Sequence, residues 1–119
     1  MNTYPRFLIR QRAFLKMIFI KEAQRGSFYG LQVKQVVGKT FESFNYVPTN
    51  SEIYKSLHEL IEDEILKSSK ILKPDTTYQE LVVYSVQDED KARAYLRAVK
   101  SDLDYSVHLL QKSLNEYFK

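Results

Sequence analysis

Side chains that donate hydrogen bonds gather in one short stretch of this 119-residue chain. Between residues 50 and 60 a serine, a tyrosine, a lysine and a histidine recur three or four positions apart, which places them on one face of a helix. Such groups donate to phosphate oxygens and base edges, and the amides at a helix N-terminus favour an anion. We predict a DNA-contacting surface made of Asn50, Ser51, Tyr54, Lys55 and His58. For His58, simple exposure to solvent explains the position equally well.

The start of this helix is marked by its own residues. Thr49 followed by Glu52 is a capping box, in which each side chain accepts a hydrogen bond from the backbone amide of the other residue. The helix is therefore expected to begin near Asn50. Apolar residues at the spacing of a buried stripe face the opposite way, and they are Ile53, Leu57, Leu60, Ile61 and Ile65.

The first third of the chain is strongly basic. Residues 1–41 hold eight Lys or Arg and one acid, a net charge of +7, whereas residues 42–87 carry −4. A helix is expected over residues 7–24, with a largely solvated polar side on which Arg10, Arg12 and Lys16 follow the phosphates of a polyanion. The alternative is a surface that only keeps the protein soluble. The inward side is predicted to be Leu8, Phe14, Leu15, Ile18 and Phe19.

Two helices joined by a short turn are expected before and at the donor-bearing stretch. The first opens at residues 27–30 and runs to about residue 44, and residues 45–48 form the turn, which is typical of a helix-turn-helix. Residues 66–73 and 78–86 have the composition of two strands joined by a turn at residues 74–77. This order predicts a winged helix whose wing includes Lys70 and Lys73. The apolar side of the first helix is expected to be Leu31, Val33, Val36, Val37, Phe41 and Phe44.

The expected fold class is mainly α with a small β-hairpin (α+β), as one winged-helix domain over residues 1–119 that ends in a long helix over residues 88–118. Apolar residues in this helix step by three and four, and its length is on the order of 45 Å, more than the small domain spans. A second copy of the chain is expected to cover this stripe in a homodimer. The alternative is a helix folded back on its own domain. The predicted dimer-interface residues are Leu96, Val99, Leu103, Val107, Leu110 and Leu114.

Enzyme chemistry has little support in the sequence. The chain has no cysteine, and its two histidines, His58 and His108, lack an acid or nucleophile at the spacing of a triad or metal site. We expect no catalytic residue, no metal and no cofactor, and we expect the acidic residues 59–64 to form a solvated end of their helix. The longest apolar run, residues 17–20, is too short to span a membrane, so a cytoplasmic, nucleoid-associated location is expected.

Five segments closely resemble the replication terminator protein family of Bacillus. They are FLIRQRAFLK at residues 7–16, YGL at 29–31, EIYKSLHEL at 52–60, ILK at 65–67 and QELVVY at 79–84, and they follow one another without large gaps. The resemblance implies a homodimeric winged helix, joined through its long C-terminal helix, that binds terminator DNA and halts replication forks from one side.

The resemblance also implies residue roles. Arg10, Arg12 and Lys16 resemble contacts to the DNA backbone, Ser51, Tyr54 and Lys55 a groove-reading face, and Lys70 and Lys73 wing contacts. Tyr29 matches a tyrosine implicated in fork arrest, so the replicative helicase is an implied partner; packing of Tyr29 on the core is the alternative reading.

Several positions depart from the family pattern. The wing tip at residues 74–77 is less basic than the lysine-rich family wing, Glu64 stands where the family carries glycine, and Gly26 replaces an acidic residue near Tyr29. A relative with these changes is expected to bind different sites. A winged-helix transcriptional regulator and a plasmid or phage DNA-segregation adaptor are the alternative functions.

Overall fold

The computed structural model describes residues 7–72 and 80–118, and it has the expected mainly α architecture. Lys73 and the wing tip at residues 74–77 lie outside the described residues. The order of elements confirms the winged helix-turn-helix and the long C-terminal helix. The elements are α1 (Gln11–Arg25), β1 (Phe28–Tyr29), α2 (Gly30–Phe41), the 3-10 helix η1 (Glu42–Phe44), α3 (Asn50–Glu62), β2 (Leu66–Leu72), β3 (Glu80–Val86) and α4 (Glu89–Tyr117).

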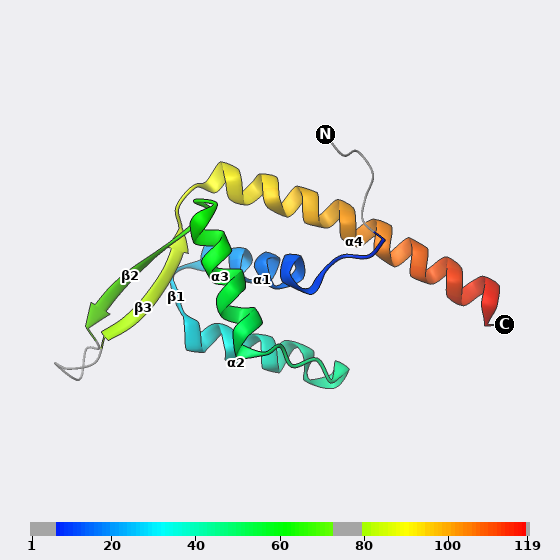
Figure 1. Ribbon diagram of the computed structural model, residues 1–119, viewed down its shortest axis with the longest axis horizontal. Helices are drawn as coiled ribbons and strands as arrows, with labels where there is room; N and C mark the ends of the chain where they lie inside the picture. The colour runs from blue at the N-terminus through cyan, green and yellow to red at the C-terminus, as the bar shows by residue number, and fades with distance from the viewer. Residues whose placement is uncertain (1–6, 73–79, 119) are drawn as a thin grey trace.

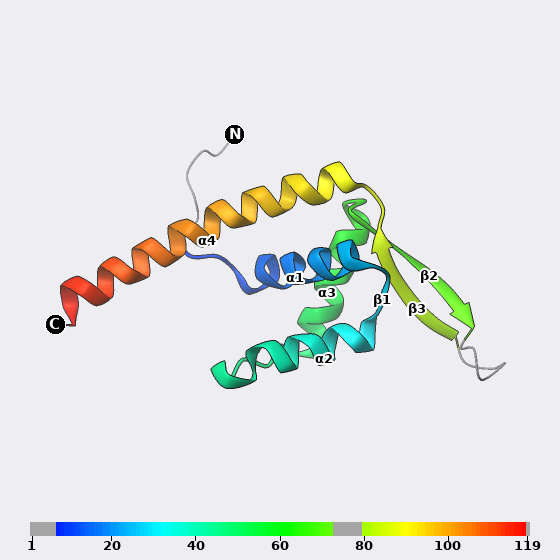
Figure 2. The same ribbon diagram turned by 180° about the vertical axis from the view of Figure 1, so that it is seen from behind.

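Helix α1 is the central element of the fold. In both views it lies between α4 and α2, and α3 crosses it (Figures 1 and 2). The β2–β3 hairpin and the C-terminal end of α4 project at opposite ends of the molecule, which measures 61 × 35 × 23 Å. The buried residues of α1 recur at helical spacing on one face, and they are Leu15, Lys16, Phe19, Ile20 and Ala23. The sequence pattern did not single out Ile20 and Ala23, and the predicted inward residues Phe14 and Ile18 are only partly buried.

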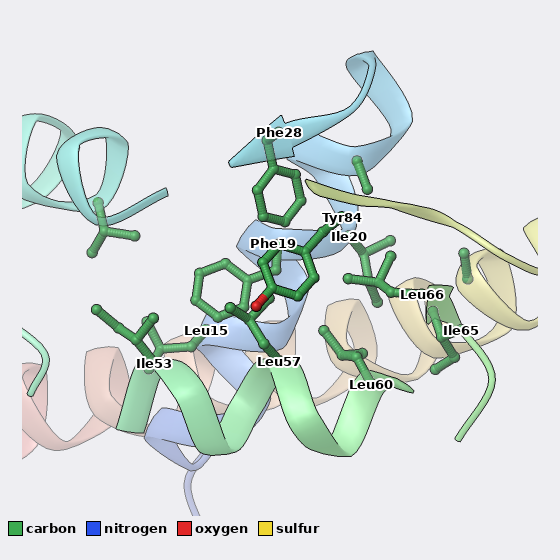
Figure 3. Close-up of a cluster of buried hydrophobic side chains, with 13 residues drawn as sticks. Leu15, Phe19, Ile20, Phe28, Ile53, Leu57, Leu60, Ile65, Leu66 and Tyr84 are labelled. Carbon is green, nitrogen blue, oxygen red and sulfur yellow. The ribbon is translucent and has the colours of Figure 1, made fainter. Parts of the chain in front are cut away.

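The hydrophobic core forms where α1, α3 and the sheet meet. Figure 3 shows Ile53, Leu57 and Leu60 of α3 pointing toward Leu15 and Phe19 of α1. These five side chains are at most 2% exposed. The predicted apolar stripe of α3 is therefore confirmed, and it fixes which face of the helix is left for solvent.

A two-residue strand, β1, was not expected from the sequence. It pairs antiparallel with β3, so the sheet has the order β1-β3-β2 rather than the predicted two strands. Phe28 stacks on Tyr84 with ring centroids 5.4 Å apart. Two residues are too few for a periodic pattern, and only the neighbouring strand makes them a strand.

Both N-terminal helices are shorter than predicted. Helix α1 begins at Gln11 rather than residue 7, because the chain before it runs along α4, where the amide of Ile9 donates to Ser106 Oγ at 3.0 Å. Helix α2 ends at Phe41, and the change to the 3-10 helix leaves Phe44 75% exposed instead of on the apolar side.

The C-terminal end of α3 forms a Schellman motif. The amide of Ile65 donates to the carbonyl of Leu60 at 2.9 Å, and the amide of Glu64 donates to that of Ile61 at 3.0 Å. This turn requires a left-handed residue, and Glu64 occupies it with φ 62°. Glycine adopts this conformation without steric cost, so glutamate is held there against its own preference.

Helix α4 divides into two halves with different surroundings. Its N-terminal half packs on α1, with Ala92 and Val99 buried and Leu96 partly buried against the core. Its C-terminal half projects beyond the other elements (Figures 1 and 2) and leaves Val107, Leu110 and Leu114 at least 50% exposed. The helix thus covers its stripe with its own domain at one end only. Among the described residues no helix combines the length and apolar character that a membrane span requires.

Candidate nucleic-acid interface

The donor-bearing face of α3 lies on the surface, as predicted. Asn50, Ser51, Lys55 and His58 are exposed, and Tyr54 is 59% exposed. The hydrophobic contacts of the opposite face hold the helix by its buried side, so these donors share one accessible face. Such a face matches what a helix needs in order to lie in the major groove.

The N-terminal cap of α3 is only half of the predicted capping box. Thr49 Oγ1 accepts from the amide of Glu52 at 3.1 Å, which confirms the start of the helix. The Glu52 carboxylate does not return to Thr49. It accepts instead from the guanidinium of Arg12, with Nη2 to Oε1 at 2.9 Å and Nε to Oε2 at 3.3 Å. A charged partner on another helix is stronger than a neutral amide, so tertiary contact overrides the local motif.

Arg12 and Lys16 join α1 to α3 through a cluster of four charges. Arg12 Nη1 donates to Glu59 Oε2 at 2.5 Å, and Lys16 Nζ donates to Glu59 Oε1 at 2.5 Å. Arg12 therefore bridges Glu52 and Glu59, two carboxylates that lie two turns apart on one edge of α3. We call Arg12, Lys16, Glu52 and Glu59 the α1–α3 ionic cluster.

Two expectations about these charges were wrong. Lys16 was expected to be largely solvated, but its side chain is 10% exposed and its ammonium lies 6.0 Å from the ring centroid of Tyr95 on α4. Glu59 was expected to be solvated, but both of its oxygens accept from α1. Hydrogen bonds from α1 hold the pKa values of both carboxyls below their ordinary range, with Arg12 as the main cause for Glu52 and Lys16 for Glu59.

The sequence contained a signal for this cluster that charge counting missed. Arg12 and Lys16 are four residues apart on one helix, and Glu52 and Glu59 are seven apart on another, so each pair lies along one side of its helix. Complementary charges repeated at helical spacing indicate an interface between helices. The excess of basic residues in the first third is accordingly smaller on the surface than in the sequence.

The remaining predicted contacts are spread over three elements. Arg10 is exposed just before α1, and Lys70 is exposed on β2 opposite Val82. His58 Nε2 lies 2.8 Å from Glu62 Oε1 on the same face of α3. The structure thus brings Tyr54, Lys55 and His58 together with Arg12 around one shallow hollow, whose lining also includes Glu59 and Glu62. Arg10 and Lys70 are set apart from this hollow.

Tyr29 occupies a structural position at the junction of β1 and α2. It pairs with Val83 across the sheet, and its amide donates to Gln32 Oε1 at 2.8 Å. Its side chain is partly buried. Both readings from the sequence, a core-packing aromatic and a surface contact, are compatible with this placement.

We compared the chain with known proteins by sequence and by structure. The chain is 38% identical over 112 residues to the replication termination protein of Bacillus subtilis. The matched region covers 94% of this chain and 92% of that protein. The same figures hold for the protein of Bacillus spizizenii. Among solved structures, a transcriptional regulator from Clostridium thermocellum is similar with a TM-score of 0.64 and 17% identity, covering 91% of this chain and 96% of that one.

A further solved structure, Bacillus subtilis PadR in complex with operator DNA, matches with a TM-score of 0.55 and 18% identity over 69% of this chain and 46% of that one. These likenesses show the winged-helix fold. The family model described as replication terminator protein matches residues 6–118, which include α1, α3, the wing strands and α4. With the exposed donor face of α3 in place on that fold, the chain belongs to the replication terminator protein family.

Proposed function

We propose that this protein binds specific duplex DNA sites as a homodimer and halts replication forks there, acting on nucleoid DNA in the cytoplasm. The observation that carries the proposal is the exposed face of α3 on a chain of the replication terminator family. Tyr54 and Lys55 contact base edges in the major groove, and Ser51 and Asn50 donate to phosphates near the N-terminus of the helix. His58 reaches the DNA when its pair with Glu62 opens.

Two further elements hold the DNA backbone in this proposal. Arg10 contacts a phosphate beside α3, and Lys70, together with Lys73, follows the adjoining minor groove from the wing. Support for this comes from the exposure of Arg10 and Lys70 and from their positions on different segments, since contacts spread along the duplex fix register and orientation. Arg12 and Lys16 were also predicted from the sequence as backbone contacts, but both bind carboxylates of α3 in this structure.

The dimer forms through the projecting half of α4. Val107, Leu110 and Leu114 recur at helical spacing, and each is at least 50% exposed among the residues that the structure describes. Burying such a stripe against its copy removes apolar area from water at both helices at once. Leu103 is partly buried next to this stripe, whereas Val99 is 3% exposed and offers little area to a second copy.

A DNase footprint on the protein's own replicon, followed by a fork-arrest assay at the protected site, tests the proposal. A block to forks from one side only is the expected result. Tyr54→Ala with Lys55→Ala should abolish site selection while leaving the fold intact, because both side chains point to solvent. Unchanged specificity in this double variant would overturn the groove assignment.

Tyr29 is proposed to contact the replicative helicase. The proposal is supported by the partial exposure of its side chain at the β1–α2 junction. Tyr29→Ala should then reduce fork arrest without changing DNA affinity. Equal loss of both would indicate a structural role.

A transcriptional regulator is the second candidate function. It is favoured by the likeness of the fold to PadR in complex with operator DNA. Strong, site-specific binding at promoters with no one-sided fork block would support it, and binding at a partition locus would support a DNA-segregation adaptor.

A further inference from the structure

Arg12 occupies an unusual place for a predicted DNA contact. All three nitrogens of its guanidinium donate to carboxylates of α3: Nε and Nη2 to Glu52, and Nη1 to Glu59. The planar fork of arginine fits a carboxylate with two parallel hydrogen bonds, so the pair with Glu52 constrains both the distance and the orientation of the two helices. If Arg12 swung to a phosphate, the Glu52 carboxylate would lose both of these bonds.

The two carboxylates lie at the edge of the donor face of α3. Glu59 lines the same hollow as Tyr54, Lys55 and His58, and Arg12 closes one side of that hollow. Glu52 is close enough to Lys55 for the lysine charge to help lower the pKa of this carboxyl. Unpaired negative charges at this edge would repel an approaching DNA backbone.

We propose that Arg12 acts in DNA recognition as a positioning residue, which clamps Glu52 and Glu59 to α1 and, together with Lys16, neutralises these two carboxylates beside the recognition face. This inference rests on the proposed DNA-binding function. In it, Lys16 completes the arrangement from its buried position by holding the second oxygen of Glu59. Arg10, exposed just before the helix, is the residue of this segment that contacts phosphate.

A charge-balanced pair of substitutions separates positioning from direct contact. Arg12→Gln leaves Glu52 without its partner, while Glu59 keeps Lys16. Arg12→Gln with Glu52→Gln removes the partner and the carboxylate together and restores the net charge. If Arg12 positions and neutralises, the single variant weakens binding to the footprinted site by roughly tenfold, and the double variant recovers to within about threefold of the original protein.

The salt dependence of binding gives a second, independent readout. A residue that does not touch phosphate leaves the slope of log K against log salt unchanged, whereas loss of one phosphate contact reduces its magnitude by about 0.9. If the double variant binds DNA as weakly as Arg12→Gln, and both variants show a reduced salt slope, the proposal is overturned. Arg12 would then be a direct contact to the DNA phosphate backbone. Arg93→Gln is the matched control, since Arg93 pairs with Glu89 on α4 and carries the same charge change away from α3.

The clamp can also be measured without DNA. A double-mutant cycle on thermal unfolding with Arg12→Gln and Glu52→Gln should show a favourable coupling between the two residues, and zero coupling would overturn the clamp itself. Arg12→Lys keeps the charge without the fork and should lie between the original and Arg12→Gln in DNA affinity. If the original protein fails to bind duplex DNA while the coupling persists, both the proposed function and the role of Arg12 in DNA recognition are wrong. The Arg12–Glu52 pair would then have a structural role only.

Discussion

The two halves of α4 carry the same pattern of apolar residues but have opposite surroundings. Ala92, Leu96 and Val99 pack within the protomer, whereas Val107, Leu110 and Leu114 project from it. A stripe at this spacing therefore predicts that a surface is buried, but it does not predict whether the same chain or another molecule covers it. In this chain α1 packs against the first half, as the alternative of a helix folded on its own domain expects, and a second copy is proposed to cover the other half.

The largest effect is expected from a charge in the covered half. Val99→Asp places a carboxylate at a position that is 3% exposed in the apolar contact between α4 and the rest of the protomer. We expect destabilisation by about 4 kcal/mol or more, a large part of the stability of a small domain. Thermal or urea unfolding measures this loss. A folded variant with near-normal stability would mean that this half of α4 is not packed as described.

A charge in the projecting half should have a different outcome. Leu110→Asp with Leu114→Asp leaves each protomer folded, because both side chains are at least half exposed in it, but repulsion between copies should prevent dimerisation. Sedimentation should shift from dimer to monomer, and DNA affinity should fall because two linked half-sites are no longer bound together. The melting temperature should also lose its dependence on protein concentration. A variant that stays dimeric would move the interface away from this segment.

Acid should weaken the protomer through the α1–α3 ionic cluster, independently of the dimer. The pKa values of Glu52 and Glu59 are lowered in the folded state, so their contribution is present above their ordinary value of 4.5 and is lost as pH falls through the folded pKa. Glu52→Gln with Glu59→Gln should therefore be less stable than its parent at pH 7, and the difference should narrow below about pH 4.5.

The difference in stability between parent and variant should also narrow at low pH when Glu52→Gln and Glu59→Gln are combined with Leu110→Asp and Leu114→Asp, which make the protein monomeric. Unfolding scans at several pH values measure it. A pH response that requires the dimer would show that these carboxylates act between copies rather than within one.

The smallest effect is expected at the end of α3. Glu64→Gly should stabilise the protomer by about 0.5–1 kcal/mol, because glycine relieves the left-handed conformation at φ 62°. Asp63→Gly is the control, since Asp63 has φ −82° and gains nothing from glycine. The gain should be the same in dimer and monomer. Destabilisation by Glu64→Gly would show that the glutamate side chain contributes more than its backbone costs.

Local signals were enough to predict the elements that position the site. The Thr49 cap, the stripe of Ile53, Leu57 and Leu60, and the composition of the two wing strands act over a few residues each. All are confirmed, the strands over residues 66–72 and 80–86. The donor face of α3 followed from the same periodicity. These features depend on hydrogen bonds and burial within one turn or one strand pair, so a sequence pattern can encode them.

Features that depend on contact between distant segments were missed or misjudged. The strand β1 exists only because β3 lies beside it, and α1 starts late because Ile9 bonds to Ser106, 97 residues away. Lys16 and Glu59 were predicted to be solvated because each charge was considered alone, whereas its partner lies on a different helix.

By itself the sequence determined the order of the four helices and the two wing strands, the apolar stripe of α3 and its donor face, since these follow from side-chain types at fixed spacing. Tertiary structure alone decided which charges face solvent and which half of α4 is covered, since these depend on what packs alongside. Charge and apolar spacing are properties of one segment, but neutralisation and burial are properties of two.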